Sequence, residues 1–149
     1  MKCMGRAWAI AMKDQNPYSK TQGGKRADLD NQYFRSAWEA NWARYLNWLQ
    51  SLKEIQCWAF EVKTFEFSKI RRGSRFYTPD FQVTNNDGSI EYHEVKGFMD
   101  SRSATKLKRM AKYFPDVRIV LIEKAAYTDV ARKIGRMLPG WEWNTKHGN

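Results

Sequence analysis

The chain has 149 residues, a length that fits one domain and leaves little room for two. Its 26 Lys and Arg against 16 Asp and Glu give a formal net charge of +10, which points to an acidic partner, most commonly nucleic acid. No apolar run approaches the roughly 20 residues that a bilayer-spanning helix needs, so we expect no membrane span.

The start of the chain and the cysteine content bear on location. Met1–Arg6 has neither a sustained apolar stretch nor a convincing cleavage site, so we expect no secretion. Cys3 and Cys57 are too few for a disulfide framework, and with His93 and His147 they make no zinc pattern. Together these features predict reduced thiols and a cytoplasmic protein.

The first predicted elements are an arm and a helix. Residues 1–33 lack a periodic stretch and are interpreted as a basic N-terminal arm or leader, which either touches DNA or is disordered, and 34–149 as a single domain. From residue 38 on, apolar side chains recur every three or four residues, which predicts one buried helical face. They are Trp38, Trp42, Tyr45, Leu49 and Leu52. Ser36 and Glu39 have capping-box spacing, so the helix is expected to begin near Ser36.

Three strands are predicted next. Cys57–Phe67 is aromatic and partly alternating, Lys69–Arg75 is a basic turn, and Phe76–Thr84 is the returning strand. Asn85–Gly88 carries the strongest hairpin signal of the chain, and Ser89–Lys96 follows it as the third strand.

The second half alternates helix and strand. Asp100 or Ser101 is expected to cap a helix that runs to about Tyr113, before Pro115. Its inward positions are Leu107, Met110, Ala111 and Phe114. Val117–Ile122 suits a buried strand, and 126–138 a last helix. A strand that returns through a helix usually lies parallel to its neighbour. The fold class is therefore α/β, with a mixed sheet flanked by helices and a C-terminal helix.

Two carboxylates and a lysine converge in this arrangement. Glu94 and Lys96 are two residues apart on a strand, so they share one sheet face. A two-residue hairpin loop sets Asp80 opposite residue 95, and a four-residue loop sets it opposite His93; both bring it beside Glu94. Pro79 removes a ladder donor, which indicates a bulge or an interruption.

Paired carboxylates repel each other unless a cation or a proton joins them. A hard divalent ion such as Mg²⁺ takes oxygen ligands, polarises a phosphodiester and lowers the pKa of water. A nearby lysine offsets charge that develops in the transition state. On a basic protein this set predicts metal-dependent phosphodiester hydrolysis.

The same residues carry a resemblance to a known family. Tyr77-Thr-Pro-Asp-Phe81, followed by Glu94-Val-Lys-Gly97, resembles the PD-(D/E)xK nuclease superfamily. With Arg35-Ser-Ala-Trp-Glu39 opening a helix, and Lys96-Gly-Phe-Met-Asp100, the chain is similar to phage endonuclease I Holliday-junction resolvases over about residues 34–123.

This resemblance implies a restriction-endonuclease-like core of order αβββαβ. It implies that Glu39, Asp80 and Glu94 bind one or two Mg²⁺ ions, with Mn²⁺ as a substitute, and that Lys96 assists catalysis. It also implies a homodimer that acts on branched DNA, in the host cytoplasm if the chain is phage-encoded, without a small-molecule cofactor.

Each of these residues also has a purely structural interpretation. Glu39 suits a helix cap, Asp80 a turn, and Glu94 with Lys96 an exposed ion pair of little energetic value. His93 points to the opposite sheet face from Glu94, so we interpret it as a structural or surface residue.

Basic residues gather in two places that suit phosphate contacts. The turn carries Lys69, Arg71, Arg72 and Arg75, and the following helix carries Arg102, Lys106, Lys108, Arg109 and Lys112. The alternative is a solvated face. Trp141 and Trp143 suit the cover of a sheet edge or a dimer interface.

The function predicted first is a magnesium-dependent, structure-selective DNA endonuclease that cleaves branched DNA, a Holliday-junction resolvase. Two alternatives stay open. One is a non-catalytic DNA-binding accessory protein on a nuclease fold, and the other is a nuclease that acts on linear or single-stranded DNA.

Overall fold

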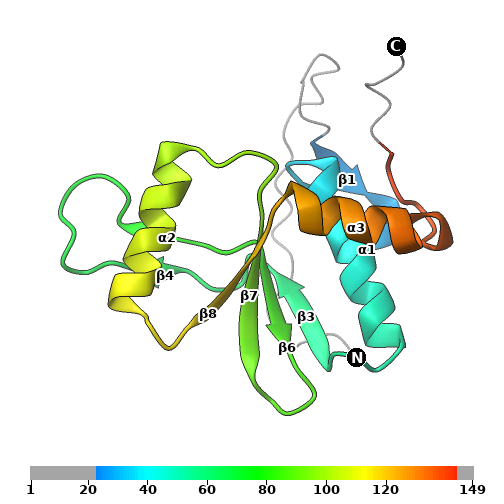
Figure 1. The fold of residues 1–149 in the computed structure, drawn as a ribbon, viewed down its shortest axis with the longest axis horizontal. Coiled ribbons are helices and arrows are strands. Elements are labelled where there is room, and N and C mark those ends of the chain that lie inside the picture. Colours follow the sequence, from blue (N-terminus) through cyan, green and yellow to red (C-terminus); the bar gives the residue numbers. More distant parts are fainter. Residues whose placement is uncertain (1–22, 144–149) are drawn as a thin grey trace.

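Four strands form the central sheet of the protein (Figure 1). The computed structural model describes residues 23–143. The strands stand in the order β3 (Cys57–Phe60), β6 (Phe81–Thr84), β7 (Ile90–Val95) and β8 (Arg118–Ile122). The first three are antiparallel and β8 is parallel to β7, which confirms the predicted mixed sheet.

Helices cover both faces of this sheet (Figure 1). On one face, α1 (Ala37–Ser51) and α3 (Lys124–Ile134) close the larger apolar core, which includes Leu46 and Phe81. On the other face, α2 (Ser101–Tyr113) closes a smaller core around Met110. Strand alternation separates the two cores, because consecutive side chains of β7 point to opposite faces.

Helix α1 begins where its cap predicts. The Ser36 hydroxyl accepts a hydrogen bond from the Glu39 backbone N–H at 3.2 Å. Trp42 is buried as expected, but Leu52 is half exposed, so its predicted inward position is wrong. Leu52 follows the last turn as the C-cap residue, where the helical stripe no longer faces the core.

The two predicted long strands are each broken. Between β3 and β6 the chain leaves the sheet and forms a separate ribbon of β4 (Phe65–Glu66) and β5 (Phe76–Tyr77). The interruption expected at Pro79 is confirmed, because β5 ends two residues before it and β6 begins two residues after it. Proline cannot donate to a ladder, so the strand breaks there.

The hairpin between β6 and β7 has a five-residue loop, 85–89. Phe81 pairs with His93 and Thr84 with Ile90. Both predicted registers are therefore wrong by one residue, and extension of the observed register sets Asp80 opposite Glu94. Gly88 has a φ of +86°, a left-handed conformation that glycine adopts without strain.

The later elements follow the prediction with three corrections, the first being that β8 is mostly half-buried, with only Ile122 buried. The Asp100 side chain caps α2 by accepting the Ser103 N–H at 2.7 Å. Met110 is buried on α2, but Ala111 is exposed, so its inward assignment is wrong. The last helix ends at Ile134 instead of 138 and continues as a short 3₁₀ turn, η2 (Gly135–Met137).

Part of the predicted N-terminal arm is folded. β1 (Gly24–Arg26) pairs with β2 (Gln32–Phe34) through a 3₁₀ turn, η1 (Ala27–Leu29). Leu29 and Phe34 are buried in the larger core. From residue 24 on, the chain is therefore part of the domain, whereas residues 1–22 lie outside the described part.

A buried polar network ties this hairpin to the end of the chain. The Arg44 guanidinium contacts Asp28 at 2.7 Å and Glu142 at 2.8 Å. Asn41 is fully buried and donates to the Tyr127 hydroxyl and to the Glu142 carbonyl, each at 2.7 Å. These bonds satisfy polar groups that would otherwise be costly to bury.

Two further expectations concern the cysteines and a membrane span. The expectation of reduced thiols concerns Cys3 and Cys57 together, and Cys3 lies outside the described residues. Among the helices of residues 23–143, none has the length and apolar character to cross a membrane.

We predict that Asn41→Ala lowers the free energy of unfolding by about 2–4 kcal/mol, because it leaves buried partners without a hydrogen bond. Asn47→Ala is the control, since Asn47 lies on the same helix and its bond with Trp58 is exposed. Urea unfolding measures both. Equal losses in the two variants would contradict the structural role of Asn41.

Candidate active site

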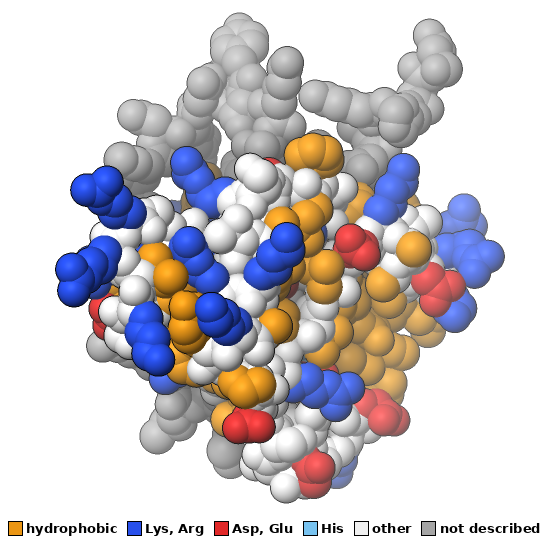
Figure 2. All heavy atoms as spheres, turned by 60° about the vertical axis from the view of Figure 1, so that its left-hand side comes forward, with side chains coloured by type: hydrophobic (Ala, Val, Ile, Leu, Met, Phe, Trp, Pro, Cys, Tyr) orange, Lys and Arg blue, Asp and Glu red, His pale blue; other side chains and the backbone are white. Residues whose placement is uncertain are grey.

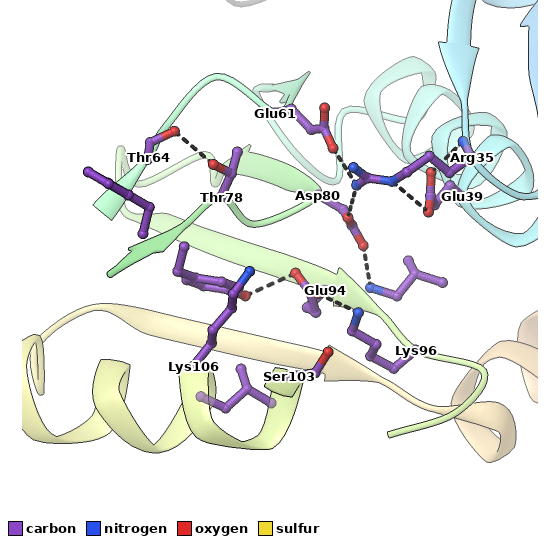
Figure 3. Close-up of a pocket in the computed structure, with 14 residues that line it drawn as sticks. Arg35, Glu39, Glu61, Thr64, Thr78, Asp80, Glu94, Lys96, Ser103 and Lys106 are labelled. Carbon is purple, nitrogen blue, oxygen red and sulfur yellow. Dashed lines mark hydrogen bonds and ion pairs between the residues drawn. The ribbon is translucent and has the colours of Figure 1, made fainter. Parts of the chain in front are cut away.

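The four residues predicted to carry the chemistry line one cavity of about 630 Å³ (Figure 3). Glu39, Asp80, Glu94 and Lys96 all contribute side chains to it. They come from the first turn of α1, from the bend before β6, and from the end of β7. The cavity therefore forms where the antiparallel hairpin meets the start of the first helix.

Asp80 is the most constrained carboxylate of the cavity. It is 4% exposed, its Oδ2 accepts the Val95 backbone N–H at 2.8 Å, and its Oδ1 lies 3.3 Å from Arg35 Nη2. Burial raises the pKa of Asp80 to about 8, and the nearby Glu94 and Glu39 carboxylates add to this effect. Its position thus favours either a proton or a cation.

Glu94 lies on the face of β7 toward α2, with one partner at each oxygen. Its Oε2 accepts a hydrogen bond from the Tyr77 hydroxyl at 3.0 Å, and its Oε1 pairs with Lys96 Nζ at 3.2 Å. Burial and the Glu94 charge raise the pKa of Tyr77, so this hydroxyl stays a donor. Glu94 and Lys96 form an ion pair, as the alternative interpretation of these two residues expected. That interpretation placed the pair in solvent, whereas Glu94 is buried.

Glu39 combines a structural contact with its place in the cavity. Its Oε2 accepts the Arg35 backbone N–H at 3.0 Å, one residue before the N-cap Ser36. Its Oε1 lies 3.8 Å from Arg35 Nε. Burial raises the pKa of Glu39. One oxygen therefore serves the helix start while the other faces the cavity.

Sequence reasoning missed two charged residues of the site. The Arg35 guanidinium contacts Glu61 as well as Asp80. Glu61 follows β3 with a φ of +48°, a strained conformation for a residue with a side chain. Arg35 stands beside Ser36 in the quoted motif, which was the available signal. No sequence signal marked Glu61, because it reaches the cavity through a left-handed bend of the backbone.

The donor chemistry of the cavity suits a hard divalent cation, since Glu39, Asp80 and Glu94 offer only oxygen ligands. As arranged, the described part of the chain has no group of three or more His, Cys, Asp or Glu side chains set to hold a metal ion. Arg35, Lys96, Tyr77 and the Val95 N–H contact the carboxylate oxygens instead. Cation binding would require some of these contacts to be exchanged.

His93 lies on the opposite sheet face, as expected. Its Nδ1 accepts a hydrogen bond from Trp42 Nε1 at 3.0 Å, and its Nε2 lies 2.9 Å from Glu91 Oε1. Burial lowers the pKa of His93, which favours the neutral ring. The predicted place of His93 on the opposite sheet face is therefore confirmed, and its side chain is buried rather than at the surface.

The two predicted basic clusters lie on the face that carries α2 and the β4–β5 loop. Figure 2 shows Lys and Arg side chains gathered there with few acidic ones among them. Lys106 also lines the cavity. Arg109 donates to the Ser74 carbonyl, which ties α2 to the loop, and Arg75 pairs with Glu66 at 3.3 Å. These two arginines thus have structural partners.

We predict that Asp80→Asn changes the pH dependence of stability in the absence of metal. Asp80 has an ordinary pKa of 3.8 when unfolded and a pKa of about 8 when folded. Between roughly pH 4 and 8 the folded state holds the extra proton, so its stability falls as the pH rises. The variant lacks this loss, and its advantage over the wild type should grow from pH 4 to about pH 8. Urea unfolding in EDTA across this range measures the difference; parallel pH profiles would contradict it.

Comparison with known proteins identifies one family. A search of curated proteins and a search of solved structures each found no match. Residues 19–129 match the family described as "Protein of unknown function (DUF1064)". The match covers well over half of the chain and includes all four residues of the candidate site. The chain therefore belongs to the DUF1064 family.

Proposed function

We propose that this protein is a magnesium-dependent DNA endonuclease with a restriction-endonuclease-like core. The observation that carries the proposal is the convergence of Glu39, Asp80, Glu94 and Lys96 on one cavity. These positions were selected from sequence motifs that are separated by up to 57 positions along the chain (39 to 96). The order of α1, three sheet strands, α2 and β8 also agrees with the αβββαβ order of such a core.

Each side chain has a role that its surroundings support. Asp80 and Glu94 offer oxygens on adjacent segments, and Glu39 adds a third from α1. A divalent cation held there would supply charge that polarises a phosphodiester and activates water. Lys96 is placed to stabilise charge on the phosphate, since its ammonium group lies at the cavity and is partly exposed. Tyr77 orients Glu94 through its hydroxyl.

The surroundings of the cavity support a nucleic-acid substrate. Lys106 lines the cavity (Figure 3) and lies on α2, the helix on the basic face. Lys69, Arg71 and Arg72 are exposed on that loop, and Arg102 and Lys108 on α2. Such residues contact phosphates without reading the base sequence. The phosphate backbone of a nucleic acid would therefore meet basic side chains along its way to the candidate site.

Branched DNA is the proposed substrate class, and it comes from the resemblance to phage junction resolvases. A four-way junction presents two scissile phosphates related by approximate two-fold symmetry. A homodimer with paired sites would match that symmetry. We therefore propose a homodimer that resolves Holliday junctions in the cytoplasm of its host cell.

We predict that the purified protein cleaves a labelled four-way junction in Mg²⁺. Asp80→Asn and Lys96→Ala should each lower the cleavage rate by about 100-fold or more, because they remove a cation ligand and a charge at the phosphate. Salt-sensitive binding of the junction should remain. Gel assays of cleavage and of binding, run in parallel, measure both.

Arg132→Gln, on the exposed face of α3, is the matched control and should cleave like the wild type. A panel of three-way, single-stranded and linear DNA separates branch-selective cutting from the other nuclease activity. If no DNA in the panel is cut while the protein still binds it, the enzyme proposal is wrong and the accessory role replaces it.

We predict that the β4–β5 loop contributes phosphate contacts. Changing Lys69, Arg71 and Arg72 together to Gln should weaken DNA binding and lower the slope of log affinity against log salt by about 1 per lost contact. Changing Lys124, Arg132 and Lys133 of α3 to Gln is the control with the same charge loss. Equal effects of the two triple variants would show that overall charge, and not this loop, sets binding.

A further inference from the structure

The guanidinium of Arg35 bridges carboxylates from three separate parts of the chain (Figure 3). It lies 3.8 Å from Glu39 on α1 and 3.3 Å from Asp80 before β6, and it also contacts Glu61 after β3. Its own side chain is 59% exposed, so it sits at the mouth of the cavity. One flexible guanidinium thus contacts three carboxyl groups at the cavity.

The oxygens that Arg35 faces are the ones left over from other contacts. Asp80 Oδ2 accepts the Val95 N–H and Glu39 Oε2 accepts the Arg35 N–H. The remaining oxygens, Asp80 Oδ1 and Glu39 Oε1, both face the guanidinium. Any cation that takes these two oxygens must therefore compete with Arg35.

Glu61 provides a position to which Arg35 can withdraw. Glu61 is not among the predicted metal ligands, and its side chain is 32% exposed at the rim of the cavity. Its backbone has a φ of +48°, a strained conformation for a residue with a side chain, and its carboxylate contacts Arg35. Arg35 can thus release Asp80 and Glu39 and still keep one carboxylate partner.

We propose that Arg35 is a cation latch. In the metal-free protein its guanidinium contacts Asp80 and Glu39 as well as Glu61, and a divalent cation that binds displaces it from Asp80 and Glu39 and leaves it paired with Glu61. This inference rests on the proposed function, which supplies the cation, and it adds a competition that sets the affinity for that cation. Lys96 has no such role, because its ammonium group contacts Glu94 alone among the four carboxylates.

The test is calorimetric titration of the full chain with Mn²⁺ alone, without DNA. Arg35→Gln removes the competing charge, so it should bind Mn²⁺ roughly 3- to 10-fold more tightly, the equivalent of two partly exposed ion pairs. Arg132→Gln removes the same charge from an exposed pair on α3 and should leave the affinity unchanged. Arg35→Lys keeps the charge but loses the planar fork, so it should tighten binding by about twofold.

The outcomes separate the latch from the proposed function. If the wild type binds Mn²⁺ and neither Arg35 variant binds it more tightly, the latch is wrong and the metal site stands. If no protein in the series binds Mn²⁺, the proposed function fails and the latch falls with it. Thermal unfolding checks that each variant is folded. If Arg35→Gln does not fold, Arg35→Lys still tests the proposal.

Discussion

The burial of one carboxylate, Asp80, organises the candidate site. A buried carboxyl group is tolerated only with close polar partners, and each partner of Asp80 comes from a different segment. The Val95 N–H ties it to the end of β7, and Arg35 ties it to the start of α1. The contacts that provide hydrogen-bond partners for Asp80 therefore also hold together the elements that line the cavity.

This arrangement has an energetic cost that the proposed cation site would offset. Burial and two neighbouring carboxylates raise the pKa of Asp80 to about 8, and Glu61 holds a strained backbone beside it. Perturbed carboxylates and local strain gather at functional sites more often than elsewhere. A cation relieves the repulsion among Glu39, Asp80 and Glu94, so the fold and the proposed chemistry depend on the same electrostatic demand.

Local signals in the sequence predicted much of the fold. The caps Ser36 and Asp100, the break at Pro79 and the parallel return of β8 depend on a few neighbouring residues or on chain connectivity. The register between β6 and β7 was predicted wrongly, because a turn rich in Asn and Gly indicates a hairpin but does not fix the length of its loop. The fold of residues 24–34 was missed because its stability comes from burial of Leu29 and Phe34 against distant elements.

The residues of the candidate site could be selected from the sequence, but their geometry could be predicted only in part. Motif spacing and the family resemblance selected Glu39, Asp80, Glu94 and Lys96. Their convergence depends on long-range packing of α1 against the hairpin. The most direct test is a crystal structure of the protein with Mn²⁺, with the metal located by its anomalous signal. We expect one or two peaks within about 2.5 Å of carboxylate oxygens of Asp80, Glu94 and Glu39. A peak elsewhere, or none at saturating Mn²⁺, would contradict this account of the site.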